Sequence, residues 1–587
     1  MSVHRRTIAA TLAAVTIGGT GLAQVASASP TSHWAGTATK AFHLTGVKVL
    51  GAPAADRRLH IGLALAPRDR GAVDRAVKAM YTPGSATYHR FISPKQWNAR
   101  YAPTTAAVVR ATSYLRHEGM RDIHVSGNRL LVTADTTVGR AEQAFHTSLT
   151  TFVLDGARRF VNVEPAMVPS ALRGIVASVQ GLNNLPLTHV EPQLAKQAGS
   201  PDIESGLFPA QFNTTYLSKG TRKGSKTSIA IMTQGDTKGV ISSLRFAERK
   251  EHQPRVPVSV VPTGPQSTDA SGADEFDMDT QVSTMVPGGV KHLYLYSIGS
   301  LVSTNLLGGI EDFVSQDVAQ AMSASIGGCD LNAYLDGSME ATDVALQQGA
   351  LQGQTFFASS GDNGAGCGYV IAVGVPAGVP EANWPCDGEY VVCVGGTSLI
   401  VDDKGNRISE LGWAGSGGGF SVVANPGFWT QATDPAYEAG LVSGGRATPD
   451  IALDGDPNLA TPVKVYVGKS ISYVGGTSLS SPMMLGFWAR LESSHRNLLG
   501  FAAPGLYGLY EKVNPGVSVT APLEPITVVV PSPAPKAVPQ YTDILIGDNG
   551  PYPCLPGYDL VTGVGAPNVA AISKALATPR VARRHAR

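Results

Sequence analysis

The tetrapeptide Gly-Gly-Thr-Ser occurs twice in this chain of 587 residues, and a serine in such a turn is a candidate nucleophile. One copy ends at Ser398 and the other at Ser478. Ser478 is followed by Pro482 and a long apolar run, which predicts a glycine turn and then a helix with the proline in its first turn. A serine there lies beside backbone N–H groups that can stabilise an oxyanion. An alternating strand follows Ser398, so we interpret Ser478 as the nucleophile and Ser398 as a structural residue.

A serine nucleophile needs a general base, and the sequence argues against histidine in that role. After residue 200 the histidines stand only at positions 252, 292, 495 and 585, and none is followed by glycine. Glu275 and Asp279 offer another route, because they are spaced i and i+4 in a segment that predicts a helix ending at Pro287-Gly288. Val282 and Val286 continue the same stripe, so both carboxylates are expected to face the interior. Burial and mutual repulsion would raise one or both pKa values there and favour a shared proton.

Asp277 and Asp362 need separate interpretation. Asp277 lies on another face of the predicted helix and is expected to be a solvated surface charge. For Glu275 and Asp279, the alternative to a buried pair is a pair of carboxylates on the protein surface. Asp362 stands just after the predicted strand Thr355–Ser359, at the edge where parallel-sheet enzymes place their sites. Its alternative is a turn aspartate, which is common in Gly-Asp-Asn-Gly loops.

Taken together, these motifs resemble the sedolisin family, the serine-carboxyl peptidases. The matching segments follow that family's order along the chain, from Glu275-x-x-x-Asp279 through Ser359–Gly364 to Gly476–Pro482. Further segments are also similar to the family: Ser323–Gly327, Gly417–Ser421 and Thr448–Ala452. Upstream, Tyr88–Gln96 is similar to a stretch of the pro-kumamolisin activation domain. The resemblance spans nearly all of residues 40–575 and implies a peptidase made as a zymogen.

The resemblance implies a role for each candidate residue. Ser478 attacks the peptide carbonyl and Glu275 takes its proton as general base, while Asp279 orients Glu275 and shares its proton. Asp362, in its protonated form, donates to the oxyanion beside the Ser478 backbone N–H. An apolar or anionic setting can keep such a carboxyl group neutral. Since Asp362 must keep its proton while Glu275 still accepts one, the expected optimum lies at acidic pH.

The resemblance also assigns substrate binding to Ser325, Ile326 and Gly327, on a strand that would line the primary specificity pocket. Some family members extend the carboxylate network with a further Glu and add a Trp to the pocket. Thr233 and Ile326 stand at those positions here. The network is therefore expected to be shorter and the pocket wall more aliphatic.

Near the C-terminus, residues 543–565 resemble the family's calcium site. Two carboxylates and three backbone carbonyls would bind the ion, as calcium prefers oxygen ligands: Asp543 and Asp559, with Ile544, Leu555 and Gly557. Leu555 stands where family members often have a glycine, which leaves the carbonyl in place. Ca2+ is therefore the expected cofactor.

The fold class predicted from the pattern is α/β. From Phe208 onward, short apolar strands alternate with helices, which indicates a mostly parallel sheet with helices on both faces, and the resemblance makes this sheet subtilisin-like. The expected strands are Ser228–Met232, Lys291–Ile298, Ala321–Ile326, Thr355–Ser359, Tyr390–Val394 and Lys464–Val467. A smaller α/β prodomain precedes them. Its expected helices are Gly71–Met80, Thr104–Glu118 and Val138–Phe145, and its expected strands are His60–Leu65, Asp122–Val125 and Arg129–Thr133.

Five regions are expected along the chain. Residues 1–28 form a secretory signal peptide, because His4-Arg5-Arg6 precedes an apolar stretch that Ala26-Ser27-Ala28 ends. Residues 29–185 form the activation domain, 186–207 a linker that contains the maturation cleavage, 208–577 the peptidase domain, and 578–587 a basic tail. A transmembrane anchor is the alternative for the first region, and its interspersed Thr and Gly residues disfavour it.

Five cysteines leave at least one thiol unpaired within a monomer. Cys393 lies in an apolar strand and is expected to be a buried thiol. Cys367 and Cys386 flank a glycine-rich loop and are candidates to pair in an oxidising compartment.

The expected function is a secreted, extracellular endopeptidase that hydrolyses proteins or peptides at acidic pH through an acyl-enzyme, with its own prodomain as inhibitor. The 46 basic and 45 acidic residues nearly cancel, so no nucleic-acid partner is expected. A monomer is expected, without membrane contact once the signal is removed. The alternatives are a tripeptidyl-peptidase on the same scaffold and a catalytically silent binding protein, and the four filled catalytic positions argue against the second.

Overall fold

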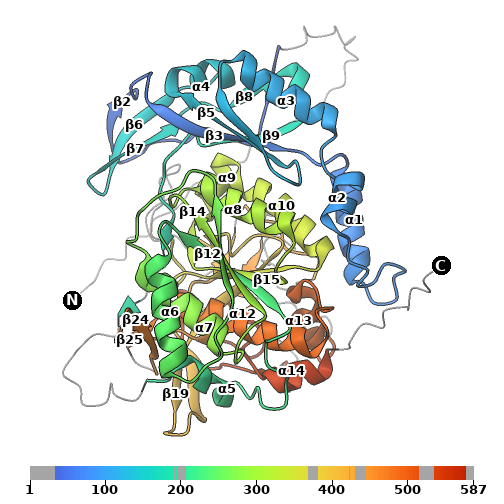
Figure 1. The fold of residues 1–587 in the computed structure, drawn as a ribbon, viewed down its shortest axis with the longest axis vertical. Coiled ribbons are helices and arrows are strands. Elements are labelled where there is room, and N and C mark those ends of the chain that lie inside the picture. Colours follow the sequence, from blue (N-terminus) through green and yellow to red (C-terminus); the bar gives the residue numbers. More distant parts are fainter. Residues whose placement is uncertain are drawn as a thin grey trace, which may run out of the picture.

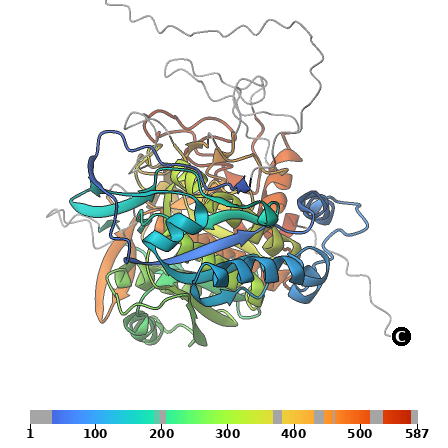
Figure 2. The ribbon, with the colours of Figure 1, turned by 90° about the horizontal axis from the view of Figure 1, so that it is seen from above.

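The computed structural model describes residues 33–189, 193–194, 206–367, 381–421, 423–429, 445–458, 461–514 and 535–576. A smaller N-terminal domain is stacked on a larger domain (Figure 1), and seen from above it lies across that domain (Figure 2). The expected signal peptide, most of the linker and the basic tail lie outside the described residues. Within the described ranges, no helix is long and apolar enough to cross a membrane.

The N-terminal domain is built on a four-stranded antiparallel sheet with the order β4–β5–β3–β9. These strands are Arg121–Val125, Leu131–Thr137, Arg58–Leu65 and Val176–Gln180. Two helices, α3 (Thr105–His117) and α4 (Val138–Phe145), pack against this sheet around a separate apolar core. A second antiparallel sheet joins β2 (Lys48–Gly51), β6 (Leu149–Leu154) and β7 (Ala157–Asn162), and β1 (Trp34–Gly36) pairs with β8 (Met167–Pro169).

Helices α1 (Arg70–Tyr81) and α2 (Pro94–Arg100) extend from the N-terminal domain along the side of the larger one (Figure 1). The buried Tyr81 hydroxyl donates to the Ala350 carbonyl at 2.7 Å and accepts from the Phe501 N–H at 2.8 Å. Asn128 is also buried at this contact, where its amide donates to Gln348 at 3.0 Å and to Glu311. Because these polar groups find their partners across the boundary, the two domains form one packed unit.

An eight-stranded sheet forms the centre of the larger domain, in the order β13–β14–β12–β15–β17–β19–β20, with β23 also paired to β19. The strands are β12 (Ser228–Gln234), β13 (Val258–Thr263), β14 (His292–Ile298), β15 (Ala321–Ala324), β17 (Thr355–Ser359), β19 (Val391–Val401), β20 (Arg407–Gly412) and β23 (Ile451–Asp454). Every pairing is parallel except that of β19 with β20. The strands β12, β15 and β17 are buried at every residue, as central strands covered on both faces should be.

Helices cover both faces of this sheet, as predicted. On one face lie α7 (Ala273–Met285) and α12 (Thr477–Ser494), with α6 (Lys238–Lys250), α13 (Ala502–Glu511) and α14 (Val569–Ala575) packed around them. On the face turned toward the N-terminal domain lie α8 (Ser303–Gln316), α9 (Asp330–Asp336) and α10 (Ser338–Gln352) (Figure 1). The short helix α5 (Phe212–Thr215) and the 3-10 turns η1 (Ser170–Leu172) and η3 (Pro209–Gln211) complete the set.

Short antiparallel pairs lie outside the main sheet. Strands β24 (Val463–Val467) and β25 (Ser470–Gly475) form a hairpin, to which β11 (Gln193–Leu194) adds. Strand β16 (Ile326–Cys329) pairs with both β10 (Thr188–His189) and β18 (Asn383–Trp384). The remaining pairs are β21 (Gly419–Phe420) with β22 (Ala447–Thr448) and β26 (Tyr541–Thr542) with β27 (Ala566–Pro567).

Each expected strand and helix overlaps an observed one, with two informative differences. The predicted strand at 464–467 belongs to the β24–β25 hairpin and not to the parallel sheet. The strand predicted over 321–326 is interrupted at Ser325, since β15 ends at Ala324 and β16 begins at Ile326. The interruption lets β16 leave the main sheet, which periodicity alone could not indicate.

The expectation that Pro482 lies in the first turn of its helix is wrong. Helix α12 begins at Thr477, so Pro482 is the sixth helical residue, in the second turn. Proline has no N–H, so the carbonyl of Ser478 four residues earlier loses its helical partner. The position is tolerated because another group reaches that carbonyl, as described below.

One thiol stays unpaired as expected, but the expectations for Cys393 as a thiol and for Cys367 pairing with Cys386 are wrong. Cys329 pairs with Cys367, and Cys386 pairs with Cys393, while the unpaired thiol is the buried Cys554. The Cα atoms of Cys386 and Cys393 lie 4.7 Å apart across a tight connection into β19. Pairing follows proximity in space, which the spacing along the chain does not reveal.

The expectation that Asp277 is a solvated charge is wrong as well. Helix α7 is buried nearly all round, because α6 and the β24–β25 hairpin cover the side opposite the main sheet. Asp277 is 2% exposed, and burial raises its pKa to about 8, an effect that hydrogen bonding by Ser243 opposes. A carboxyl group in this position is held mainly in its neutral form.

We predict that Asp277 makes the protein less stable as the pH rises. Because the pKa of Asp277 is raised in the folded state, the stability that its carboxyl group contributes is fully present below about pH 4. This stability is lost as the pH rises through about 8. Asp277→Asn should therefore raise Tm at pH 8 by about 2 °C or more and leave it nearly unchanged at pH 4. Thermal unfolding of full-length protein at both pH values measures this, with the exposed Asp274→Asn as matched control. Equal shifts at the two pH values would contradict the assignment.

Candidate active site

The side chains that the sequence singled out for catalysis meet at the carboxyl ends of the parallel strands. Ser478 is the second residue of α12, just after the left-handed Gly476, whose φ is 107°. Asp362 follows the end of β17, and Ser325 follows the end of β15. Since α7 packs directly against α12, it brings Glu275 and Asp279 to the same place. Four segments far apart in the sequence thus supply one buried polar cluster.

Glu275 and Asp279 face the interior together, as their spacing predicted, with exposures of 1% and 0%. The Ser325 hydroxyl donates to Asp279 Oδ1 at 2.9 Å. Burial raises the pKa of Glu275 well above its usual value and the Asp279 charge raises it further, while the Ser478 hydroxyl lowers it. Burial also raises the pKa of Asp279, and the Ser325 hydroxyl counteracts this. The two carboxyl groups therefore hold protons together and lose them in separate steps.

Asp362 reaches the cluster from the opposite side. Its Oδ1 accepts the Thr477 backbone N–H and the Thr477 hydroxyl, both at 2.8 Å. Its Oδ2 is buried and has no hydrogen-bond partner among the described residues. A Cβ on Gly476 would stand 2.6 Å from Oδ2, so only glycine allows this approach. Burial raises the pKa of Asp362 to about 7, and the two bonds from Thr477 oppose that rise.

The proline in α12 creates an acceptor inside the site. The Ser478 carbonyl lacks an N–H partner at Pro482, and the Ser325 hydroxyl lies 3.5 Å from it. Ser325 thus touches both Asp279 and the backbone of the candidate nucleophile. Thr233, by contrast, contacts the Tyr296 carbonyl at 3.4 Å.

Ser325 lies between β15 and β16, and Ile326 and Gly327 begin β16. Ile326 and Gly327 are buried in β16, whose backbone pairs antiparallel with Thr188 and His189 of β10. The segment before the peptidase domain therefore already occupies this edge.

A second stretch of the linker lies on the other side of the nucleophile turn. Gln193 pairs with Gly475 and Leu194 with Val474, antiparallel along β25. Strand β25 ends at Gly475, two residues before Thr477. Two described stretches of the expected linker thus pair with strand edges, Thr188–His189 with β16 and Gln193–Leu194 with β25.

The two Gly-Gly-Thr-Ser copies lie next to each other but differ in setting. A Cβ built on Gly396 would stand 3.4 Å from the Thr477 side chain. In the upstream copy, Thr397 donates to Glu410 at 2.7 Å and Ser398 donates to Asp456 at 2.6 Å. Ser398 lies within β19, not at a helix start, so the structure agrees with a structural role for it.

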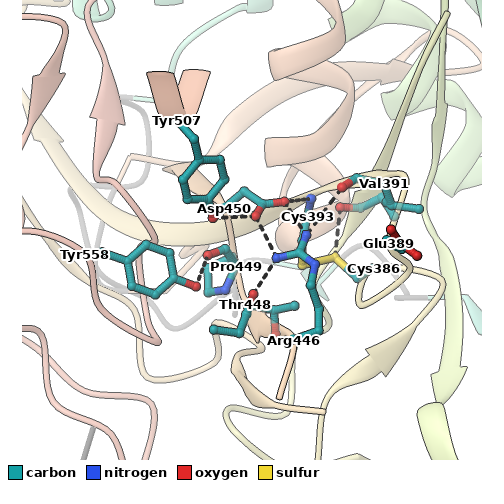
Figure 3. Close-up of polar contacts among 12 residues, drawn as sticks. Cys386, Glu389, Val391, Cys393, Arg446, Thr448, Pro449, Asp450, Tyr507 and Tyr558 are labelled. Atoms are coloured by element: carbon teal, nitrogen blue, oxygen red, sulfur yellow. Dashed lines mark hydrogen bonds and ion pairs between the residues drawn. A yellow bond between two sulfur atoms is a disulfide. The ribbon is translucent and has the colours of Figure 1, made fainter. Parts of the chain in front are cut away.

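A buried ion pair that the sequence reading missed supports the strands behind the site. Arg446 is fully buried, and its guanidinium donates to Asp450 Oδ1 at 2.8 Å and Oδ2 at 2.7 Å (Figure 3). Tyr507 and the Cys393 N–H also donate to Asp450, at 2.6 and 2.7 Å. The only available signal was Thr-Pro-Asp before a strand, because the arginine partner is not marked by any pattern.

This ion pair connects to the candidate calcium loop through a tyrosine. The Tyr558 hydroxyl donates to the Pro449 carbonyl at 2.9 Å (Figure 3). Tyr558 stands between two of the expected ligand positions, Gly557 and Asp559. Strand β23 begins directly after Asp450 and ends at Asp454, whose carbonyl accepts from Ser480 of α12.

The expected calcium ligands lie around one loop. Asp543 accepts from the Gly557 N–H at 3.0 Å, and Asp559 accepts from the Leu555 N–H at 3.2 Å. Burial raises the pKa of Asp559 to about 7. In the described part of the chain, the carbonyls of Ile544, Leu555 and Gly557 accept no backbone hydrogen bond. Two carboxylates and three free carbonyls suit a hard cation, so the residues fit calcium.

Comparison with known proteins agrees with this architecture. The family description "Pro-kumamolisin, activation domain" matches residues 45–185. Sedolisin from Pseudomonas sp. (strain 101) is 32% identical over 511 residues, covering 82% of this chain and 85% of that protein. Xanthomonalisin from Xanthomonas sp. (strain T-22) is 28% identical over 544 residues, covering 82% of this chain and 64% of that protein. Tripeptidyl-peptidase 1 from Canis lupus familiaris is 24% identical over 588 residues, covering 90% and 93%.

Among solved structures, the fold is similar to that of Pseudomonas sedolisin, a serine-carboxyl proteinase complexed with two molecules of pseudo-iodotyrostatin. The TM-score is 0.54 at 28% identity, over 63% of this chain and 97% of that chain. The chain belongs to the sedolisin family of serine-carboxyl peptidases. It is a serine-type peptidase made as a zymogen, and its N-terminal domain is an activation prodomain that acts as inhibitor.

We predict that the stability of the peptidase domain depends strongly on the Arg446–Asp450 pair. Asp450→Asn would leave a fully buried guanidinium without its counter-charge, which should cost about 3–5 kcal/mol of unfolding free energy. The exposed pair of Asp236 with Lys238 gives a matched control, since Asp236→Asn should cost less than about 1 kcal/mol. Denaturant unfolding of both variants, made in an inactive Ser478→Ala zymogen, measures the difference. Equal costs would contradict the prediction.

Proposed function

We propose that this protein is the zymogen of a secreted endopeptidase that cleaves peptide bonds at acidic pH through an acyl-enzyme. The observation that supports this most is the meeting of Ser478, the Glu275–Asp279 pair and Asp362 in one buried cluster at the start of α12. Serine supplies a nucleophile, an ionised carboxyl group supplies the base, and a carboxyl group that keeps its proton supplies the acid. No histidine is needed in such a site.

In the proposed reaction, Ser478 Oγ attacks the substrate carbonyl carbon while its proton passes to Glu275. Asp279 stabilises the proton on that pair and is itself oriented by Ser325 at 2.9 Å. The negative charge that forms on the carbonyl oxygen is met by the Ser478 backbone N–H, at the positive end of α12, and by the proton on Asp362. Glu275 then returns its proton to the leaving amine, and water attacks the resulting ester by the reverse path.

The raised pKa of Asp362 supports a working range below neutral pH, while burial raises the pKa of Glu275 and Asp279 and so moves the acid limb upward. Asp362 must be protonated to donate, and its pKa of about 7 means that it loses the proton as the pH rises through neutral. Glu275 must be ionised to accept, and the pair with Asp279 provides one carboxylate once its first proton leaves. Activity is therefore expected between these two events, as a bell-shaped profile whose alkaline side reports Asp362.

The linker supports the proposed substrate-binding mode. Strands β10 and β11 lie antiparallel to β16 and β25, on the two sides of the nucleophile turn. A substrate would take the same extended course along Ser325–Gly327 after maturation, because an exposed strand edge binds peptides through backbone hydrogen bonds. Maturation is proposed to cut within residues 186–207, between the prodomain and the peptidase domain.

Secretion is proposed from residues 1–28, which have the composition of a signal peptide. The mature enzyme is proposed to act as an extracellular monomer. A tripeptidyl-peptidase on the same scaffold is the main alternative activity, because one relative of this chain is named tripeptidyl-peptidase 1.

Calcium is proposed to bind at Asp543, Ile544, Leu555, Gly557 and Asp559. When bound, the ion would neutralise the two carboxylates and tie the 555–559 loop to residues 543–544. Because Tyr558 contacts Pro449, the same loop supports the start of β23 behind the site. The proposed role of calcium is structural, and no step of catalysis needs it.

We predict that Ser478→Ala abolishes both maturation and peptidase activity. At about pH 4 the wild-type zymogen should convert to a shorter form cleaved between about residues 185 and 207, while Ser478→Ala stays full length. Its kcat should fall by about 10⁴-fold or more. Ser398→Ala is the matched control, and it should mature and retain activity. An alanine variant at 478 that still processes itself would refute the nucleophile.

The same preparation distinguishes the alternatives. Mass spectrometry of products from a denatured protein substrate should show internal fragments of many lengths for an endopeptidase. A ladder of tripeptides released from the amino terminus would instead identify the tripeptidyl-peptidase. No product from a correctly matured protein would favour the binding protein.

We predict that removing calcium lowers stability without touching the catalytic residues. In a Ser478→Ala zymogen at pH 7, EDTA should lower Tm by several °C, about 1–2 kcal/mol, and added Ca2+ should restore it where Mg2+ does not. Asp559→Asn should remove the response, whereas the exposed neighbour Asp548→Asn should keep it. A response that persists in Asp559→Asn would place the ion elsewhere.

A further inference from the structure

We propose that Thr477 is a positioning residue that decides which oxygen of Asp362 carries the catalytic proton. This inference rests on the proposed role of Asp362 as donor to the oxyanion. From the sequence, Thr477 is only part of the turn before Ser478. The structure links it to Asp362 by two separate hydrogen bonds.

The two oxygens of the Asp362 carboxyl group have different surroundings. Both bonds from Thr477 end on Oδ1, each at 2.8 Å. Oδ2 is buried and receives no hydrogen bond from the described residues. An oxygen that already accepts two hydrogen bonds is the poorer place for a proton, because protonation there would remove one acceptor position. The proton is therefore directed to Oδ2.

The Thr477 hydroxyl has a defined orientation. A hydroxyl has one proton to donate and two lone pairs to accept. The Gly361 N–H donates to Thr477 Oγ1 at 3.0 Å, which leaves the hydroxyl proton free to point at Asp362. Asn383 fixes the same loop by donating to the Ser360 carbonyl at 2.8 Å. The donor direction is thus set by the backbone of the Asp362 loop itself.

The direction of Asp362 Oδ2 follows from its neighbours. A Cβ on Gly476 would come within 2.6 Å of it, and the next two residues are Thr477 and the nucleophile Ser478. A proton on Oδ2 therefore faces the turn where the oxyanion forms, while a proton on Oδ1 would face Thr477. The charged groups that face Asp362 across the site are Glu275 and, behind it, Asp279 on α7. Both are carboxyl groups, so no cation competes for Oδ2 among the described residues.

The test compares Thr477→Val with Thr477→Ser in the full-length zymogen matured at acidic pH. Valine keeps the methyl group and the backbone N–H but loses the hydroxyl. We expect Thr477→Val to lower kcat by about 10–100-fold with KM within about twofold, and Thr477→Ser to stay within about threefold of wild type. The alkaline limb of kcat/KM should move to higher pH in Thr477→Val. The hydrogen bond from the Thr477 hydroxyl lowers the pKa of Asp362, so the pKa rises when valine removes that bond.

A matched control comes from the other Gly-Gly-Thr-Ser copy. Thr397 is equally buried and donates to Glu410 at 2.7 Å, away from the nucleophile. Thr397→Val loses the same kind of bond, so it should affect stability but leave kcat and the pH profile per folded molecule unchanged. The proposal is wrong if Thr477→Val has a wild-type pH profile, or if Thr477→Ser loses as much kcat as Thr477→Val.

Two further measurements separate this proposal from the proposed function. If Thr477 acts through Asp362, adding Thr477→Val to Asp362→Ala should cost nothing more in kcat. If Asp362→Ala alone keeps full activity, the oxyanion role of Asp362 fails, whatever Thr477 does. Additive losses in the double variant would overturn the role of Thr477 while leaving that of Asp362 intact.

An infrared measurement tests the proton position without activity or maturation. In an inactive Ser478→Ala zymogen at acidic pH, the carbonyl stretch of protonated Asp362 is the band that Asp362→Asn removes. With the proton on Oδ2, the carbonyl oxygen is Oδ1 and accepts two hydrogen bonds. Thr477→Val should raise the frequency of this band because one bond is lost. An unchanged band would overturn the proposal.

Discussion

The structure depends on keeping three carboxyl groups buried together without a counter-ion. Glu275, Asp279 and Asp362 make no ion pair in the described part of the chain, and burial raises the pKa of each. A buried carboxyl group without a cation is stable only when it keeps its proton or receives several hydrogen bonds. Ser325 supplies one such bond to Asp279 and Thr477 supplies two to Asp362, so the three groups depend mainly on keeping protons. The site is thus built from groups that exchange protons, which is what acid–base chemistry at a serine requires.

This constraint explains the surrounding architecture. Helix α7 is buried from Glu275 to Met285, so Glu275 and Asp279 are shielded from solvent. Helix α12 places its N-terminal end beside the nucleophile, because Gly476 adopts a positive φ and contacts Asp362 closely. Pro482 leaves the Ser478 carbonyl without its helical donor, and the Ser325 hydroxyl, which donates to Asp279 at 2.9 Å, lies 3.5 Å from that carbonyl. Each local irregularity, whether a broken strand, a left-handed glycine or a proline within a helix, serves the contact of one segment with another.

The prodomain follows the same logic on a larger scale. It contacts the α8 and α10 face of the main sheet, and two short stretches of the linker pair with β16 and β25. Backbone pairing needs no particular side chain, so these stretches can occupy the two strand edges regardless of their sequence. A zymogen of this kind is inhibited by its own chain until that chain is cut.

The sequence by itself determined the elements, their order and the chemical types in the site. Glu275 and Asp279 share a face because of the 3.6-residue helical period, and the apolar strands β12 and β17 indicate burial on both sides. The tertiary structure alone decided which segments meet. It buried Asp277, paired Cys386 with Cys393, joined Arg446 to Asp450, and gave Thr477 its contact with Asp362. The reason is that periodicity reports one face of one element, whereas these contacts depend on how separate elements pack, which no local pattern encodes.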